Sequence, residues 1–182
     1  MSTERVIVRP AVPTDAAALS ELGAETFRET FDDSNTPEDM ARYLAESFFP
    51  EQQAAEIADP QSVVLVAEHH TPSGPTALVG YAQLRSGDVP VDVQGPDPLE
   101  LKRLYVLRAW HGRGVAQALM QVCLDTAHAR GCGTLWLGVW EHNGRAQAFY
   151  AKYGFVRVGQ HAFVLGTDVQ TDWLMSRAMG DG

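Results

Sequence analysis

The chain has 182 residues, the length of one ordinary domain, with 45% hydrophobic and 20% charged residues. This composition is globular and excludes a wholly disordered chain. The 14 Lys and Arg residues against 23 Asp and Glu residues give a net charge of −9. Such a charge argues against binding to nucleic acid or to a membrane surface, because both depend on basic side chains. The negative net charge favours a cationic substrate over an anionic one.

The opening residues and the cysteines predict a cytoplasmic protein. The first ten residues, MSTERVIVRP, contain a glutamate and no long apolar stretch, so we expect no secretory signal peptide. No apolar run approaches the length of about 20 residues that a membrane helix needs. Cys123 and Cys132 make neither a disulfide framework nor a metal-binding spacing, so we expect no metal and a reducing environment.

The first third of the chain predicts one short strand followed by helices. Residues 6–8 form the strand, and apolar residues at helical spacing predict a helix over 16–31. Thr36 precedes a proline and stands three residues before Asp39, a combination typical of a helix start. A second helix is therefore expected to run to about residue 47, and a third over 51–58.

The middle of the chain predicts a hairpin and an insertion. Residues 63–68 and 77–85 are mostly apolar and predict two strands, which flank a turn, HHTPSGPT. Residues 86–98, SGDVPVDVQGPDP, are rich in Gly, Pro and Asp, and we interpret them as an exposed insertion.

The last part of the chain alternates strands and helices. Strands are expected over 99–107, 134–140, 155–165 and 172–179, and helices over 115–130 and 143–153. A strand, helix and strand in this order predict a right-handed parallel crossover with a ligand at the carboxyl ends of the strands. The whole chain, 1–182, is therefore expected to be a single domain of the α/β class, with a central twisted mixed sheet and helices on both faces.

The strongest functional signal is His111-Gly112-Arg113-Gly114-Val115-Ala116, which lies directly between a predicted strand and a predicted helix. Two glycines allow a tight turn, and the free amides and positive dipole end of the helix favour an anion such as a pyrophosphate. Arg113 could add a charge-assisted contact. The alternative is that the glycines only make a tight turn.

The second signal is the segment 143–155, NGRAQAFYAKYGF. Taken alone, it reads as a short amphipathic helix with an asparagine cap and a terminal glycine.

Together the two segments resemble the Gcn5-related N-acetyltransferase (GNAT) superfamily, over roughly residues 5–178. That superfamily's phosphate loop is Gln/Arg-x-x-Gly-x-Gly/Ala, and this chain has His111-x-x-Gly114-x-Ala116, with histidine at the first position. Its motif Asn-x-x-Ala-x-x-Phe-Tyr-x-Lys-x-Gly-Phe is matched by Asn143, Ala146, Phe149, Tyr150, Lys152, Gly154 and Phe155.

The resemblance implies an acetyl-CoA site and no metal. The pantetheine arm would lie along the end of the 99–107 strand, in a gap beside the 134–140 strand, and residues 112–116 would hold the pyrophosphate. The implied cofactor-binding residues are Leu104, Tyr105, Val106, His111, Gly112, Arg113, Gly114, Val115, Ala116, Asn143 and Lys152.

The resemblance also implies catalytic roles. Tyr150 matches the superfamily's general acid, and a phenol with a pKa of about 10 is protonated at neutral pH. The amide of Val106 would stabilise the oxyanion. The alternative for Tyr150 is a core aromatic side chain.

Glu100 is the candidate general base, six residues before Val106. Strand alternation predicts that it shares a face with Lys102 and Leu104. The alternative is a solvent-facing carboxylate that pairs with Lys102 or Arg103.

The resemblance further implies that the first two helices and the late strands build the acceptor site. The candidates are Phe27, Glu29, Thr30, Phe31, Asp33, Tyr43 and Phe48. The segment 25–39 looks like the branch that includes bacterial polyamine acetyltransferases, and its aromatic rings and carboxylates suit a polycation. We expect acetyl transfer from acetyl-CoA to a primary amine of a small molecule. The alternatives are a protein or peptide acceptor, a longer acyl donor, and a non-catalytic acyl-CoA-binding module; a homodimer is compatible with the sequence.

Overall fold

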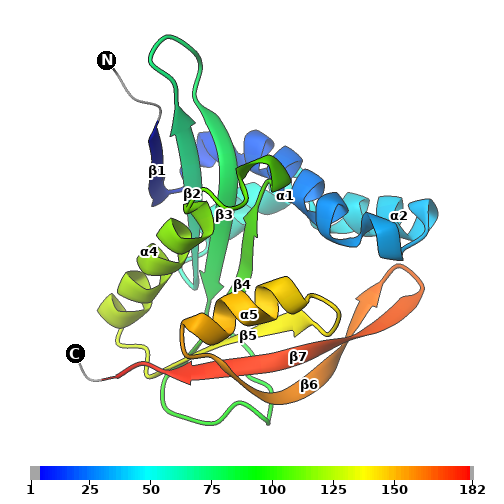
Figure 1. The fold of residues 1–182 in the computed structure, drawn as a ribbon, viewed down its shortest axis with the longest axis vertical. Coiled ribbons are helices and arrows are strands. Elements are labelled where there is room, and N and C mark those ends of the chain that lie inside the picture. Colours follow the sequence, from blue (N-terminus) through cyan, green and yellow to red (C-terminus); the bar gives the residue numbers. More distant parts are fainter. Residues whose placement is uncertain (1–4, 181–182) are drawn as a thin grey trace.

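The computed structural model describes residues 5–180, whose strands form one seven-stranded sheet in the order β1-β2-β3-β4-β5-β7-β6 (Figure 1). All neighbouring strands are antiparallel except β4 and β5, which are parallel, so the predicted mixed sheet is confirmed. The strands are β1 (Arg5–Pro10), β2 (Ser62–His70), β3 (Ala77–Arg85), β4 (Pro98–Val106), β5 (Thr134–Trp140), β6 (Val156–Leu165) and β7 (Asp168–Ala178).

Helices cover both faces of the sheet, as predicted. They are α1 (Ala16–Phe31), α2 (Pro37–Ser47), α3 (Pro50–Ala58), α4 (Val115–Ala129) and α5 (Gly144–Lys152), with short 3-10 turns at Pro13–Asp15, Asp32–Ser34 and Arg108–Trp110. Side chains of α4 and α5 share one core cluster with β2–β5, and side chains of α1 pack on the other face of β2 and β3. Within residues 5–180, no helix combines the length and apolar character needed to cross a membrane.

Local sequence signals explain where these helices begin. The side chain of Thr36 accepts a hydrogen bond from the amide of Asp39 at 3.2 Å, which confirms the predicted start of α2. Asn143 caps α5 in the same way, through the amide of Ala146 at 3.2 Å.

Two expectations need correction. The strand β7 begins at Asp168, four residues before the predicted start, because its first residues are exposed and carry no apolar alternation. The predicted insertion is not wholly exposed: Val93 is buried against Trp136 and Leu174, so this segment covers part of β5 and β7.

The strands β4 and β5 pair at only three positions, Pro98 with Thr134, Leu99 with Leu135, and Glu100 with Trp136. Beyond Glu100 the two strands part, which leaves the second half of β4 without a neighbour on that side (Figure 1). The parting lies at the carboxyl ends of the only parallel pair among the described strands, where ligands bind in α/β sheets.

A β-bulge in β4 changes which side chains share a face. Gln83 pairs with Arg103 and Leu84 with Leu101, so Lys102 has no partner on β3. The bulge shifts the alternation, and Leu104 packs in the same core cluster as Leu101. The expectation that Glu100 shares a face with Leu104 is therefore wrong.

We predict that Leu119→Ala destabilises the protein by about 2–5 kcal/mol, because truncation of a buried leucine leaves a cavity. Leu119 is fully buried between α4 and the sheet. Urea unfolding measures the change. The control is Val156→Ala, at a side chain 61% exposed, which we expect to cost less than about 0.5 kcal/mol. Equal losses in both variants would contradict this description of the core.

Candidate active site

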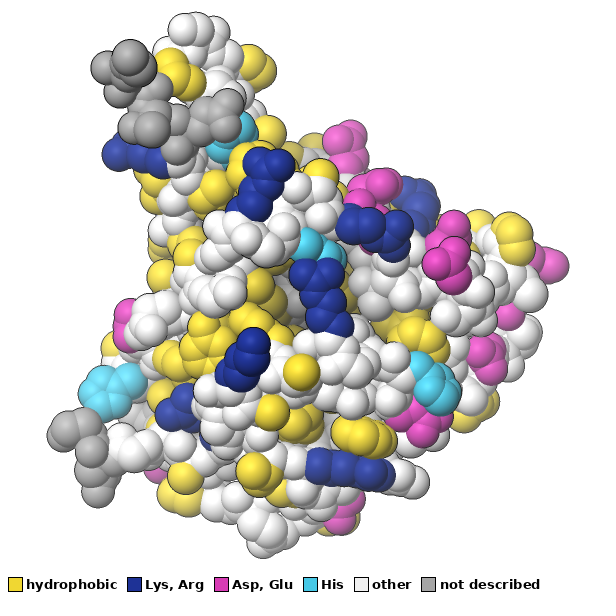
Figure 2. Space-filling model, viewed as in Figure 1, with side chains coloured by type: hydrophobic (Ala, Val, Ile, Leu, Met, Phe, Trp, Pro, Cys, Tyr) yellow, Lys and Arg dark blue, Asp and Glu magenta, His cyan; other side chains and the backbone are white. Residues whose placement is uncertain are grey.

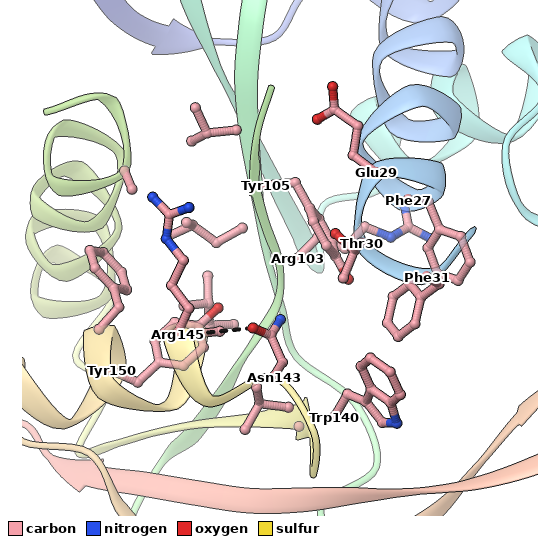
Figure 3. Close-up of a pocket in the computed structure, with 18 of the residues that line it drawn as sticks. Phe27, Glu29, Thr30, Phe31, Arg103, Tyr105, Trp140, Asn143, Arg145 and Tyr150 are labelled. Atoms are coloured by element: carbon pink, nitrogen blue, oxygen red, sulfur yellow. Dashed lines mark hydrogen bonds between the residues drawn. The ribbon is translucent and has the colours of Figure 1, made fainter. Parts of the chain in front are cut away.

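A cavity of about 880 Å³ opens where β4 and β5 part. Figure 2 shows it as a hollow at the centre of one face, and Figure 3 shows Tyr150 and Arg145 on one side of β4 and Phe27 and Phe31 on the other. The sequence-predicted residues that line it are Phe27, Glu29, Thr30, Phe31, Tyr43, Phe48, Glu100, Leu104, Tyr105, Val106, His111, Gly112, Val115, Ala116, Asn143, Tyr150 and Lys152. Asp33, Arg113 and Gly114 do not line it.

The free edge of β4 supplies backbone hydrogen-bonding groups to this cavity. The amide of Leu107 donates to the carbonyl of Val79 on β3 at 3.0 Å, and Tyr105 pairs with Tyr81. Because successive residues of a strand direct their backbone groups to opposite sides, the amides of Leu104 and Val106 point into the gap. These are donors that an extended ligand could use.

The turn before α4 lies at one end of the cavity and leaves backbone amides unpaired. Gly112 and Gly114 have φ angles of 75° and 81°, a region that other residues rarely adopt. Ala118 is the first residue of α4 whose amide bonds back to the chain, at the carbonyl of Gly114. The amides of the first turn are therefore available to a ligand. Arg113 turns instead over the ring of Trp110, at 4.9 Å.

His111 is held between two groups of the cavity wall. Its Nε2 lies 2.8 Å from the carbonyl oxygen of Val106, and its Nδ1 lies 2.6 Å from Nη1 of Arg145. A guanidinium only donates, so Nδ1 accepts and Nε2 carries the proton that is donated to Val106. The imidazole in this arrangement is neutral, and it fixes both the end of β4 and the position of Arg145.

Tyr150 lies inside the wall of the cavity, with only 8% of its surface exposed. Burial raises its pKa above the usual value for a phenol, and the nearby Cys123 raises it further. The hydroxyl therefore keeps its proton at neutral pH and can act as a donor. Beside it, Asn143 lines the cavity and uses its Oδ1 to cap α5.

Glu100 lines the cavity at the point where β4 and β5 part, but its carboxylate is paired. Its Oε2 accepts from Nε of Arg85 at 2.7 Å, rather than from Lys102 or Arg103. Lys102 lies nearby in the bulge, and burial, together with the charges of Arg103 and Arg85, lowers its pKa to about 8.

The far end of the cavity is aromatic. Phe27 stacks on Tyr43 with ring centroids 4.5 Å apart, and Phe31 lies 5.2 Å from Trp140. Glu29, predicted here as a substrate contact, accepts from the amide of Arg108 at 2.7 Å. Its carboxylate thus joins α1 to the turn that follows β4.

Sequence reasoning missed several polar side chains of this cavity, including Arg108, Arg145, His161 and Asp172. Burial raises the pKa of Asp172 to about 6, although His161, at 3.8 Å, opposes the shift. No local motif marks this pair, because β6 and β7 bring positions 161 and 172 opposite each other only through their register.

The charge around the cavity differs from the charge of the whole chain. Dark blue side chains border the hollow in Figure 2, and magenta ones gather over α1 and α2. The basic side chains that line the cavity are Lys102, Arg103, Arg108, Arg145 and Lys152. Among the side chains of residues 5–180, no group of three potential metal ligands gathers.

The chain is similar to known acetyltransferases along most of its length. The model of the acetyltransferase (GNAT) family matches residues 21–155. An uncharacterized N-acetyltransferase of Mycobacterium tuberculosis is 36% identical over 166 residues, which cover 91% of this chain and 99% of that protein. The N-alpha-acetyltransferase RimI of the same species is 33% identical over 183 residues, covering 98% and 96%.

A solved structure shows the same fold. PaiA N-acetyltransferase from Thermoplasma acidophilum, solved in complex with coenzyme A, has a TM-score of 0.75 and 20% identity, with 96% of this chain and 99% of that chain covered. The family match spans the β4–α4 turn and the α5 segment around which the cavity is built. The chain therefore belongs to the acetyltransferase (GNAT) family and is an acetyl-CoA-dependent N-acetyltransferase.

Proposed function

We propose that this protein, as a single domain, transfers the acetyl group of acetyl-CoA to a primary amine of a small molecule, with a polyamine-like amine favoured. The amine attacks directly, with both substrates bound. The observation that carries the proposal is the cavity itself, with backbone donors and basic side chains at one end and aromatic side chains with a carboxylate at the other.

The residues of the first end fit coenzyme A. The free edge at Leu104 and Val106 suits the amide groups of a pantetheine arm, which would add to β4 like a strand. A Cβ at Gly112 or Gly114 would meet no atom within 4 Å, so the turn is open to a ligand. The first-turn amides and Arg145 would hold the phosphates, with Lys152 at the rim.

When bound, acetyl-CoA supplies the acetyl thioester, and the side chains of the cavity move the protons. The Val106 amide, which points into the gap, would stabilise the negative charge on the carbonyl oxygen as nitrogen attacks carbon. As the carbon–sulfur bond breaks, Tyr150 would donate its Oη proton to the leaving sulfur. Glu100, whose Oε1 makes no hydrogen bond among the described residues, would take the proton of the amine, directly or through water.

A second candidate is acetylation of a peptide N-terminus. The observation that favours it is the 33% identity to RimI, named an N-alpha-acetyltransferase, over 98% of this chain. A coenzyme A release assay over spermidine, spermine, aminoglycosides, amino acids and peptides with free N-termini separates the two. Turnover with amines and none with peptides supports the proposal, whereas the reverse supports the peptide function.

We predict that Tyr150→Phe lowers kcat about 10²-fold or more, because the leaving sulfur loses its proton donor. The KM for acetyl-CoA should stay near the wild-type value, since the ring remains. Steady-state kinetics measures both. The matched control is Tyr153→Phe, at a ring that packs on Phe149 outside the cavity lining. Unchanged turnover in Tyr150→Phe with every acceptor would remove the acid role.

We predict that His111→Ala weakens coenzyme A binding about three- to tenfold, the size expected for the loss of one or two hydrogen bonds. Without the imidazole, neither the Val106 carbonyl nor Arg145 is held in place. Calorimetric titration measures the dissociation constant. His128→Ala, at an exposed position in the last turn of α4, is the control. Equal affinity of His111→Ala and wild type would show that this contact does not organise the site.

A further inference from the structure

A carboxylate in the acceptor half of the cavity has no role in the chemistry described above. Asp172 on β7 faces His161 on β6 and Trp140 on β5 in the register of the sheet. Both Asp172 and His161 line the cavity. Neither residue belongs to a sequence motif, and neither is needed for the acetyl transfer itself.

A glycine makes room for this pair on the surface of the sheet. A Cβ at Gly138 on β5 would lie 3.2 Å from Nε2 of His161 and 3.4 Å from Oδ2 of Asp172. Val139, the next residue on β5, is buried in the core on the other face. The floor of the cavity at Gly138 is therefore bare backbone, and the carboxylate and imidazole lie beside it.

Asp172 differs from the other carboxylates that line the cavity in having no permanent cation or amide bound to it. Glu29 accepts from the amide of Arg108, and Glu100 is paired with Arg85. Among the described residues, no Lys or Arg forms an ion pair with Asp172, and Nε2 of the His161 imidazole lies 3.8 Å from its Oδ2. A half-buried carboxylate without a cation is stabilised by a ligand that brings one.

The walls beside Asp172 are aromatic. Tyr43, Trp140 and Phe163 line the same part of the cavity, and the ring of Tyr43 lies 5.7 Å from that of Phe163. Burial raises the pKa of Tyr43, whereas Ser47 and the charge of Arg103 lower it. The charge of Asp172 adds a smaller upward shift, so Asp172 and Tyr43 lie within electrostatic reach. Such walls suit the methylene chain of a cation better than a hydrated or anionic group.

We propose that Asp172, beside His161 on the floor formed by Gly138, binds a second cationic nitrogen of the acceptor. The acceptor class is then a diamine or polyamine, in which one primary amine is acetylated while another nitrogen stays protonated against Asp172. This inference rests on the proposed function and names the group that selects its substrate.

The test compares 1,4-diaminobutane with butylamine, which lacks only the second nitrogen. Asp172→Asn keeps the shape of the side chain and removes its charge. We expect the KM for 1,4-diaminobutane to rise tenfold or more, the KM for butylamine to stay within about twofold, and kcat to change little for both. Asp168→Asn, at an exposed residue of the same strand, is the control and should behave as wild type.

A second measurement does not depend on turnover. Calorimetric titration with 1,4-diaminobutane should show binding to the wild type that Asp172→Asn loses. An equal fall of kcat for both amines in Asp172→Asn would overturn the inference and make this residue part of proton transfer. Equal diamine binding by wild type and variant, or no binding by either, would also overturn it. Failure of the proposed function is a separate result, namely acetylation of peptides and of no amine.

The preference for the diamine should also depend on pH. Asp172, with a pKa raised by burial to about 6, is ionised above that pH and neutral below it. The titratable groups that face it are His161 from β6 and Tyr43 from α2, while β5 presents Gly138 and Trp140. Loss of the negative charge of Asp172 therefore weakens diamine binding as the pH falls through this range. We expect the ratio of the two KM values to approach one below pH 6 in the wild type, and to be independent of pH in Asp172→Asn.

Discussion

The parting of β4 and β5 after Glu100 is the constraint on which the rest of the site depends. A buried strand normally satisfies its backbone groups through both neighbours, and the second half of β4 has a neighbour only in β3. The unpaired amides of Leu104 and Val106 are exposed to the cavity for this reason. The helix that crosses from β4 to β5 begins in the same place, so its first-turn amides face the same opening.

The gap also divides the cavity into two chemical environments. On the side of α4 and α5 lie the glycine turn, Arg145 and the buried Tyr150. On the side of α1 and α2 lie aromatic rings, together with Asp172 from β7. The bulge at Lys102 separates these two environments. After the bulge, the side chain of Leu104 packs in the core cluster that includes α4 and α5, and the side chain of Tyr105 packs against α1.

Much of the fold was predictable because the signals are local. The capped start at Thr36, the apolar run at 134–140 and the glycine turn at 112–114 each act within a few residues. The end of the cavity that we propose for the coenzyme shares this property, since its residues come from two continuous segments that the structure brings together. The acceptor end does not: Asp172 meets His161 through strand register, and Glu100 meets Arg85 through a pairing that the bulge shifts. No pattern in a single segment encodes those contacts.

The basic border of the hollow has a consequence for how ligands arrive. A molecule with a net charge of −9 repels a polyanion at a distance, and the five cavity-lining Lys and Arg side chains act only within about a Debye length, roughly 8 Å at physiological ionic strength. In the proposed site, capture of the coenzyme would therefore rely on short-range, directional hydrogen bonds rather than on electrostatic steering. The cationic acceptor that we propose would be attracted by the whole molecule, so added salt should slow its encounter while it eases the approach of the coenzyme.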